Sequence, residues 1–249
     1  MTDIFQPRFY RKWATAGRLE SYTVREDETD LAVKASARLV DETRELVHRY
    51  RKDLLDYAKD HPRFLTSFRP LEVDAGAAEI VKLMAASAET YGVGPMAAVA
   101  GAIAELVGRD LLNLMSKQQE APPEVIIENG GDCFIKTEQP VGVSVYAGPQ
   151  SPFGDKLRLR VDTCGGPRGV CTSSGTLGHS VSLGKADAVV TLARSAALAD
   201  AAATAIGNLV QEPEGIRGII DAEKKRGQLL GLAIVMGKHL GAWGEIEIT

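Results

Sequence analysis

The stretch Val125-Ile-Ile-Glu-Asn-Gly-Gly-Asp-Cys-Phe-Ile-Lys136 combines two short apolar runs with a glycine-rich centre. An Asn-Gly-Gly-Asp segment between two such runs is a strong hairpin signal, because glycine readily adopts the positive φ angles of a tight turn. From Ala121 onward the pattern changes to short strand-like runs separated by turns, whereas long helical periods dominate the region before it. The hairpin therefore marks the start of a strand-rich half.

Outward from this hairpin, apolar periodicity predicts strands and helices that do not alternate regularly. We expect strands at 19–25, 31–35, 125–128, 133–136, 141–146, 156–161, 170–172, 188–193, 229–235 and 244–248. Helices are expected at 41–60, 75–91, 94–117, 195–209 and 216–225. This order is typical of an α+β protein rather than an alternating α/β one. We interpret 1–249 as a single domain in which 1–18 is an N-terminal extension.

Bulk properties exclude several classes of protein. The net charge of −4 gives no global attraction to nucleic acid or to a membrane. Cys133, Cys164 and Cys171 match neither a disulfide framework nor a zinc pattern. The N-terminus lacks a signal-peptide pattern, and the longest apolar run, 95–104, is about half of the ~20 residues that a membrane span needs. We expect a cytoplasmic protein with free thiols and without a nucleic-acid or membrane partner.

The helix expected at 195–209 carries Asp200 and Thr204 one turn apart among alanines. A solvated helix face usually bears several charged residues, whereas this face bears alanines and one aspartate. One interpretation is therefore that the face is covered by another part of the protein. A covered carboxylate costs several kcal/mol unless it is paired or bound to a cation. Oxygen ligands of this kind suit Mg²⁺, which takes further ligands from water and phosphates. The alternative is an exposed face in which alanine only raises helix propensity.

The segment Cys171-Thr-Ser-Ser-Gly-Thr-Leu-Gly-His179 follows an expected strand and is rich in hydroxyls. It suits a phosphate-binding or ring-binding loop, with contacts expected from Thr172, Ser173, Ser174, Gly175 and Thr176. His179 could act as a general base or donate to a ligand, or it could be structural. Cys171 is a candidate reactive thiol if its pKa is lowered, and otherwise a small core residue.

Two glycine-containing turns are further candidates for ligand binding. In the turn from Asn129 to Asp132, Gly130 and Gly131 would let a ligand approach the backbone, and Asp132 could accept from a ribose or ring N–H. Gly94 precedes a proline that opens a helix, whose free N–H groups would favour a phosphate. The plain alternatives are a hairpin turn and an ordinary helix start. On the helix that follows, Glu105 and Arg109 are spaced to form an ion pair.

Several long strings resemble an uncharacterised family of ApbE-like proteins, over roughly residues 20–248. They are 93–105, 128–132, 171–180, 184–190 and 197–208. The wider ApbE superfamily comprises FAD:protein FMN transferases, which bind FAD and Mg²⁺ and transfer FMN to a Thr or Ser of a target protein. The resemblance implies antiparallel or mixed sheets packed with alanine-rich helices, a flavin or other nucleotide ligand, Mg²⁺ and an acceptor protein.

Individual residues match the superfamily motifs to different degrees. Asp200 and Thr204 match its Ala-Asp-x-x-x-Thr-Ala helix, which implies that they are metal ligands. The turn 130–132 matches its Gly-Gly-Asp motif, and 171–175 resembles its Ala-Thr-Ser-Gly loop with one extra serine. Ala100 stands where a lysine is expected, and the His-x-x-Asp-Pro motif survives only as His179. The ligand site can therefore be kept while the transfer reaction is lost or changed.

Three readings of the function follow. The first is Mg²⁺-dependent FMN transfer from FAD to a protein. The second is a carrier or accessory protein in anaerobic sulfur assimilation and homocysteine formation, with which the small family is associated, using Cys171. The third is a protein that binds a ligand without catalysis. The alanine-rich helices would also permit tight packing between chains in an oligomer.

Overall fold

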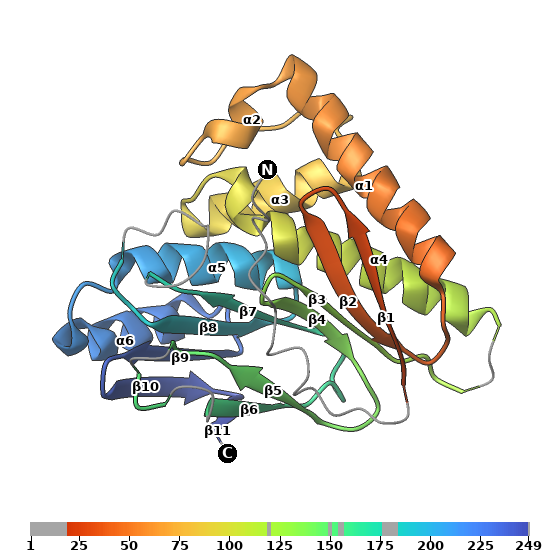
Figure 1. Ribbon diagram of the computed structural model, residues 1–249. Coiled ribbons are helices and arrows are strands. Elements are labelled where there is room, and N and C mark those ends of the chain that lie inside the picture. Colours follow the sequence, from red (N-terminus) through yellow and green to blue (C-terminus); the bar gives the residue numbers. More distant parts are fainter. Residues whose placement is uncertain (1–18, 119–120, 149–150, 154–156, 176–183, 249) are drawn as a thin grey trace, which may run out of the picture.

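The computed structural model describes residues 19–118, 121–148, 151–153, 157–175 and 184–248, which form three layers (Figure 1). Helices cover one face of an eight-stranded sheet, and a three-stranded sheet covers the other face. All paired strands are antiparallel in the described residues. The α+β prediction, with antiparallel sheets packed against alanine-rich helices, is therefore confirmed.

The large sheet has the order β1-β2-β3-β4-β7-β8-β9-β10. Its strands are β1 (Glu20–Glu26), β2 (Thr29–Ala35), β3 (Val125–Asn129), β4 (Asp132–Lys136), β7 (Arg168–Ser173), β8 (Ala188–Ala193), β9 (Gly231–Met236) and β10 (His239–Gly244). The small sheet has the order β11-β6-β5, from β5 (Val141–Val145), β6 (Leu157–Val161) and β11 (Glu247–Ile248). The small sheet is thus built from the segment between β4 and β7 and from the end of the chain.

Helices of very different length make up the third layer. They are α1 (Val40–Asp60), α2 (Arg63–Thr66), α3 (Glu79–Tyr91), α4 (Val99–Ser116), α5 (Ala196–Leu209) and α6 (Ile216–Arg226), with 3₁₀ turns η2 (Pro95–Ala98) and η3 (Pro213–Gly215). In the described part of the chain, no single helix is long and apolar enough to cross a membrane; α3 and α4 together pass that test but are bent by 102°. Both helices bury apolar side chains in the core.

Two apolar cores share the large sheet. Along β9, Leu232 and Ile234 face the helices, whereas Ala233 and Val235 face the small sheet. This alternation follows from the two-residue period of a strand. Because both faces of the central strands are covered, β8 is buried throughout and reads in the sequence as a continuous apolar run.

The hairpin predicted at 125–136 forms. Asn129 pairs with Asp132, and the two glycines between them have φ angles of +70° and +106°. The prediction was wrong at the C-terminus, where one strand over 244–248 was expected and β10 and β11 are found. Gly244 has a φ of +91°, so the chain turns there and crosses from the large sheet to the small one.

Other boundaries also differ from the prediction. The helix expected at 94–117 begins as the 3₁₀ turn η2, and the helix expected at 75–91 begins at Glu79. The four-residue helix α2 was not predicted, because so short a helix shows no periodicity.

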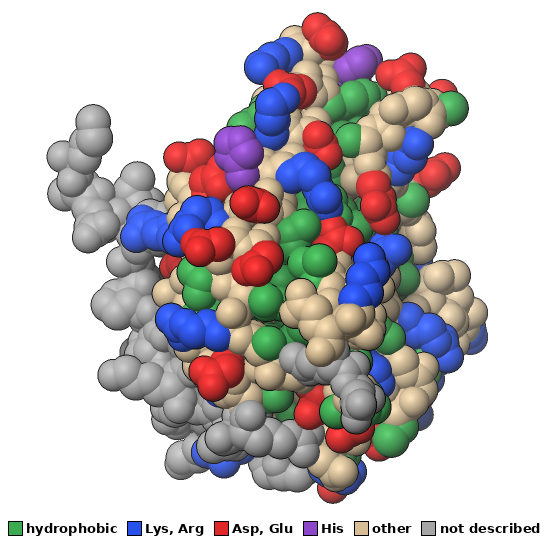
Figure 2. Space-filling model, turned by 90° about the vertical axis from the view of Figure 1, so that its right-hand side faces the viewer, with side chains coloured by type: hydrophobic (Ala, Val, Ile, Leu, Met, Phe, Trp, Pro, Cys, Tyr) green, Lys and Arg blue, Asp and Glu red, His purple; other side chains and the backbone are tan. Residues whose placement is uncertain are grey.

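The surface over α1 carries charges of both signs. Figure 2 shows acidic and basic side chains interspersed on this side of the molecule. On α1, Arg44 pairs with Asp41 at 2.6 Å and Lys59 with Asp56 at 2.6 Å. Such exposed pairs contribute little to stability, because solvent and salt screen them.

Candidate functional site

Helix α5 packs on β7 and β8 of the large sheet and contacts α4 beside it, which packs on β3 and β4. Ser195 caps its N-terminus by accepting a hydrogen bond from the Leu198 N–H at 3.2 Å. Its buried alanines are Ala196, Ala197, Ala199, Ala201, Ala202 and Ala203. The helix face around Asp200 is therefore covered, and the alternative of a freely exposed alanine face is excluded. Asp200 and Thr204 are half-buried one turn apart on this helix.

The carboxylate of Asp200 meets the first turn of α4. Its Oδ2 accepts a hydrogen bond from the backbone N–H of Gly101 at 2.9 Å. A Cβ at Gly101 would lie 2.3 Å from the carbonyl oxygen of Ala196 and 2.8 Å from the Cβ of Asp200. Glycine is thus required for the two helices to come this close. The N-terminus of α4 also carries the positive end of the helix dipole, which favours a negative group.

Asp132 begins β4 and, unlike the half-buried Asp200, is a buried carboxyl group. Its side-chain oxygen accepts from the Thr172 N–H at 3.3 Å. Burial raises the pKa of Asp132 to about 7, and nearby Glu128 adds to the increase. Burial, together with the charge of Asp132, raises the pKa of Asp200 well above its ordinary value. The charge of Asp132 on β4 therefore disfavours the ionised form of Asp200 on α5, an effect that a divalent cation would relieve.

The hairpin turn beside Asp132 is anchored at one side and open at the other. Asn129 is buried and donates from Nδ2 to the carbonyl oxygen of Ala100 at 3.1 Å, which ties the turn to α4. The Gly131 N–H donates to Glu128 at 2.8 Å. An added Cβ at Gly130 or Gly131 would meet no atom within 4 Å. The two glycines therefore border open space, as a ligand approaching the backbone would require.

The hydroxyl-rich segment leaves the sheet beside these carboxyl groups. Thr172 and Ser173 end β7 and, like Ser174 after them, are half-buried. The Gly175 N–H donates to Ala186 at 2.9 Å, and a Cβ there would lie 2.2 Å from the carbonyl oxygen of Gly184. Thr176 and His179 lie outside the described residues, so their proposed roles stay predictions.

Cys171 is a core residue of β7 in this structure. It is completely buried, and its thiol donates to the carbonyl oxygen of Ala196 at 3.3 Å. Strand pairing puts Cys133 opposite Val170, which places Asp132 next to Cys171. Burial, followed by the charges of Asp132 and Asp200, raises the pKa of the Cys171 thiol well above its ordinary value. These surroundings act against a thiolate and favour the small-core-residue alternative.

Gly94 has a different environment from the other predicted ligand-binding residues. It precedes η2, and a Cβ there would lie 1.7 Å from the carbonyl oxygen of Ser67. This side of Gly94 is thus filled by the protein's own backbone. The following turn, η2, packs against α5, the helix that carries Asp200.

The sequence did not predict the roles of Glu105 and Gly101 in this region. Glu105 was expected to pair with Arg109, but Arg109 pairs with Glu79 at 3.2 Å and Glu105 faces α5. Gly101 is the close contact between α4 and α5. The run of small residues at the start of α4 is the one sequence signal for this contact. Small side chains allow another element to come close, but they do not indicate which element it is.

No three His, Cys, Asp or Glu side chains of the described ranges form a group that could hold a metal ion. A cation at Asp132 and Asp200 would therefore take its other ligands from hydroxyl and carbonyl oxygens, water and the bound substrate. That set of oxygens fits Mg²⁺, which commonly uses one or two carboxylates plus phosphate oxygens and water.

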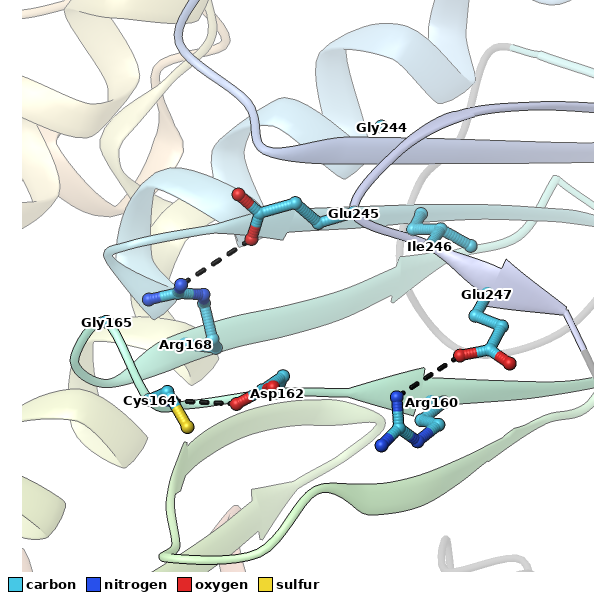
Figure 3. Close-up of a pocket in the computed structure, with 9 residues that line it drawn as sticks. All are labelled: Arg160, Asp162, Cys164, Gly165, Arg168, Gly244, Glu245, Ile246 and Glu247. Atoms are coloured by element: carbon cyan, nitrogen blue, oxygen red, sulfur yellow. Dashed lines mark hydrogen bonds and ion pairs between the residues drawn. The ribbon is translucent and has the colours of Figure 1, made fainter.

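A separate cavity of about 450 Å³ lies near the C-terminus and contains none of the predicted site residues (Figure 3). Two ion pairs line it, Arg168–Glu245 at 3.5 Å and Arg160–Glu247 at 3.3 Å. Cys164 is also part of the lining, and a hydrogen bond to Asp162 raises the pKa of its thiol. The arginines are already paired with carboxylates, and the thiolate is disfavoured, so this cavity does not suggest a catalytic site.

Comparison with known proteins gives three consistent results. A family model described as AbpE bacteria matches residues 11–231. A protein of Methanococcus aeolicus named UPF0280 is 42% identical over 202 residues, covering 80% of this chain and 79% of the relative. A UPF0280 protein of Methanopyrus kandleri is 40% identical over 224 residues, covering 88% of each chain.

Solved structures extend the likeness to the fold. The apbe protein of Thermotoga maritima superposes with a TM-score of 0.58 at 14% identity, covering 90% of this chain and 96% of the other. The flavin transferase ApbE of Vibrio cholerae gives a TM-score of 0.56 at 12% identity, covering 92% and 97%. At these identities the likeness shows a common fold.

Proposed function

Because this chain belongs to the family described as AbpE bacteria and has the fold of solved ApbE flavin transferases, we propose that it binds a flavin nucleotide together with Mg²⁺. The proposed site lies between the β3–β4 turn, the end of β7 and α5. The observation that carries the proposal is the pair formed by the buried Asp132 and the half-buried Asp200, in which burial and the charge of Asp132 disfavour the ionised form of Asp200. Asp132 and Asp200 come from β4 and α5, which are far apart in the sequence, and a cation bound between them would stabilise both ionised carboxylates.

Within this site, different residues would bind the cation and the nucleotide. Asp200 accepts from Gly101 through Oδ2, and the same carboxylate would be a ligand of the cation. Thr204 is one turn further along the same helix, and side chains four residues apart lie on one face. Bound Mg²⁺ would neutralise the pyrophosphate of FAD and stabilise the departing phosphate. Thr172, Ser173, Ser174 and the open glycine turn would contact the nucleotide.

The proposed reaction is FMN transfer from FAD to a hydroxyl of an acceptor protein. The hydroxyl oxygen bonds to the phosphorus of the FMN half, the pyrophosphate bond to that phosphorus breaks, and AMP leaves. The hydroxyl proton passes to a base, for which His179 is our candidate. The Ser or Thr of the acceptor protein is the second substrate.

Nucleotide binding without transfer is the alternative that a specific observation favours. Gly101 and Ala100 stand in the segment where the superfamily has a lysine, so one cationic group is missing from this chain. The sulfur-carrier alternative has less support, because Cys171 is completely buried and its thiol pKa is raised.

A thermal-shift panel with FAD, FMN, ADP and a nicotinamide nucleotide, each with and without Mg²⁺, tests the proposal. A ligand that binds only the folded protein must raise its apparent stability. We expect FAD with Mg²⁺ to give the largest shift, and Asp200→Asn to abolish the Mg²⁺-dependent part. Asp187→Asn is the matched control, because Asp187 also accepts from a glycine N–H, that of Gly237 at 2.7 Å, but before β8.

Release of AMP from FAD in the presence of Mg²⁺ would separate transfer from binding. An Asp200→Asn protein that is folded and keeps the full Mg²⁺-dependent shift would contradict the proposed site. Binding of FAD with no AMP release, with water or protein hydroxyls as acceptors, would favour the non-catalytic alternative.

A further inference from the structure

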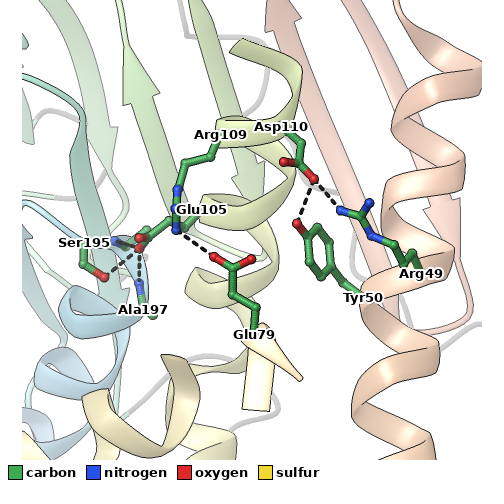
Figure 4. A network of polar contacts seen from close by, with 9 residues as sticks. Arg49, Tyr50, Glu79, Glu105, Arg109, Asp110, Ser195 and Ala197 are labelled. Carbon is green, nitrogen blue, oxygen red and sulfur yellow. Dashed lines mark hydrogen bonds and ion pairs between the residues drawn. The ribbon is translucent and has the colours of Figure 1, made fainter. Parts of the chain in front are cut away.

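The N-terminus of α5 is held by a carboxylate from another helix. Glu105 of α4 is 8% exposed, and its Oε2 accepts from the Ser195 hydroxyl at 2.6 Å, the Ala196 N–H at 2.7 Å and the Ala197 N–H at 3.2 Å. Figure 4 shows Glu105 pointing at Ser195 and Ala197. The first backbone donors of a helix have no partner within the helix, so this carboxylate satisfies groups that Ser195 alone leaves free.

The same two helices are joined a second time in the opposite direction. Asp200, one turn into α5, accepts from the Gly101 N–H in the first turn of α4. Each helix thus supplies the carboxylate that caps the other. Gly101 lets the helices approach until both bonds form. Together the two contacts restrain both sliding and rotation of α5 against α4.

We propose that Glu105 is a positioning residue for the cation-binding carboxylate of Asp200, an inference that rests on the proposed function. Ser195 accepts from Leu198, and Glu105 completes the cap by accepting from Ala196 and Ala197. The additional effect of Glu105 is to set where the first turn of α5 lies, and therefore where Asp200, four residues after Ala196, presents its carboxylate.

Such a role has a measurable size. Metal ligands are held by outer partners, and loss of such a partner commonly lowers metal affinity about 10- to 100-fold. Shortening or removing Glu105 would free the first turn of α5 while leaving Asp132, Asp200 and Thr204 unchanged in chemistry. Metal affinity should fall although every proposed ligand is present.

Mn²⁺ alone is a suitable probe, because the electron paramagnetic resonance signal of free Mn²⁺ gives its Kd directly. Glu105→Ala should raise the Kd about 10- to 100-fold. Glu105→Gln retains an oxygen that accepts from the same donors and should recover most of the affinity. The matched control is Asp110→Ala on the same helix, which removes a carboxylate that contacts α1 instead of α5 (Figure 4). It should lower stability and leave the Kd within about twofold of the wild type.

The outcomes separate the two proposals. If Asp200→Asn binds Mn²⁺ as the wild type does, the proposed function fails. If Asp200→Asn loses Mn²⁺ while folded Glu105→Ala keeps the wild-type Kd, only the positioning role of Glu105 is overturned. Should Glu105→Ala not fold, Glu105→Asp decides, because it keeps the charge but is one methylene shorter. A raised Kd supports the role, and an unchanged Kd overturns it.

Discussion

Gly101 sets the distance between the two helices of the candidate site, so a single methyl group there is a sharp test. A Cβ would lie within 2.3 Å of the Ala196 carbonyl oxygen, which is backbone and cannot swing away. We expect Gly101→Ala to lower the free energy of unfolding by about 1–3 kcal/mol, the usual cost of overpacking, and to disturb the bond to Asp200. Urea unfolding would measure the first effect, and metal binding the second.

Gly218 provides the opposite expectation from the same substitution. It is exposed in α6, and an added Cβ would meet no atom within 4 Å. Gly218→Ala should therefore raise the free energy of unfolding by about 0.5–1 kcal/mol, because alanine is the better helix former. Equal effects at both glycines would show that α4 and α5 are not in the close contact described here.

Single residues of the site differ in how far the sequence reveals them. Asp200 and Thr204 stand out because a carboxylate and a hydroxyl share one face of an alanine helix, and Asp132 because it closes a glycine turn. Glu105 does not stand out, since its own neighbours offer Arg109 as a partner and its real partners lie about ninety residues away. A contact between distant helices leaves no local pattern.

At the scale of elements, α1 is attached to α4 by a tyrosine whose titration can be followed. Tyr50 is 4% exposed and donates to Asp110 at 2.8 Å, while Arg49 pairs with the same carboxylate. Burial, followed by the hydrogen bond to Asp110, raises the pKa of Tyr50 to about 12, above its ordinary value of 10.0. The folded protein thus favours the neutral phenol.

The raised pKa of Tyr50 predicts that stability falls at high pH. The contribution of Tyr50 is complete below pH 10 and is lost as the pH rises through about 12, since the unfolded chain releases this proton more readily. Tyr50→Phe should cost about 1 kcal/mol near neutral pH. The advantage of the wild type over Tyr50→Phe should shrink between pH 10 and 12 in urea titrations. A difference that stays constant over this range would contradict the raised pKa.

The strength of each element's local signal decides how well it was predicted. The helix α1 and the β3–β4 hairpin have clear periods and turn residues, and both were located. Strand β10 contains Gly241 and Gly244, and little in it marks a strand; it exists because it pairs with β9. Its glycine at 241 is needed because a Cβ would lie 2.5 Å from Ile216 of α6. Tertiary contacts here override weak propensity.

At the scale of the whole molecule, the large sheet depends on pairings that the sequence does not predict. β4 pairs with β7, although β5 and β6 lie between them in the chain and join a different sheet. This pairing places Asp132 beside Cys171 and below α5. The α+β class follows from the order of the elements, whereas the convergence of Asp132 and Asp200 depends on this long-range register. Local patterns indicated the residues singly, whereas only the resemblance to the ApbE superfamily implied that the turn at 129–132 and the helix at 195–209 line one cleft.

The two apolar cores predict how the molecule unfolds. Each central strand contributes alternate side chains to both cores, so the small sheet cannot detach without exposing the apolar face of β8 and β9. We therefore propose that residues 19–248 form one cooperative domain. Urea unfolding followed by far-ultraviolet circular dichroism and by tryptophan fluorescence should give coincident transitions, and a chain lacking 1–18 should have the same midpoint.

Two substitutions, one in each apolar core, test whether the two cores unfold together. Ile234→Ala removes a buried side chain from the helix-side core, and Val235→Ala removes one from the small-sheet core. Ile234→Ala should lower the free energy of unfolding by about 2–5 kcal/mol, and Val235→Ala should lower it by less because valine is smaller. In both variants the two probes should still give coincident transitions. If the layers were independent, Val235→Ala would instead split off an early transition that leaves the helical signal intact. The shared sheet argues against that result, because losing one core exposes the back of the other.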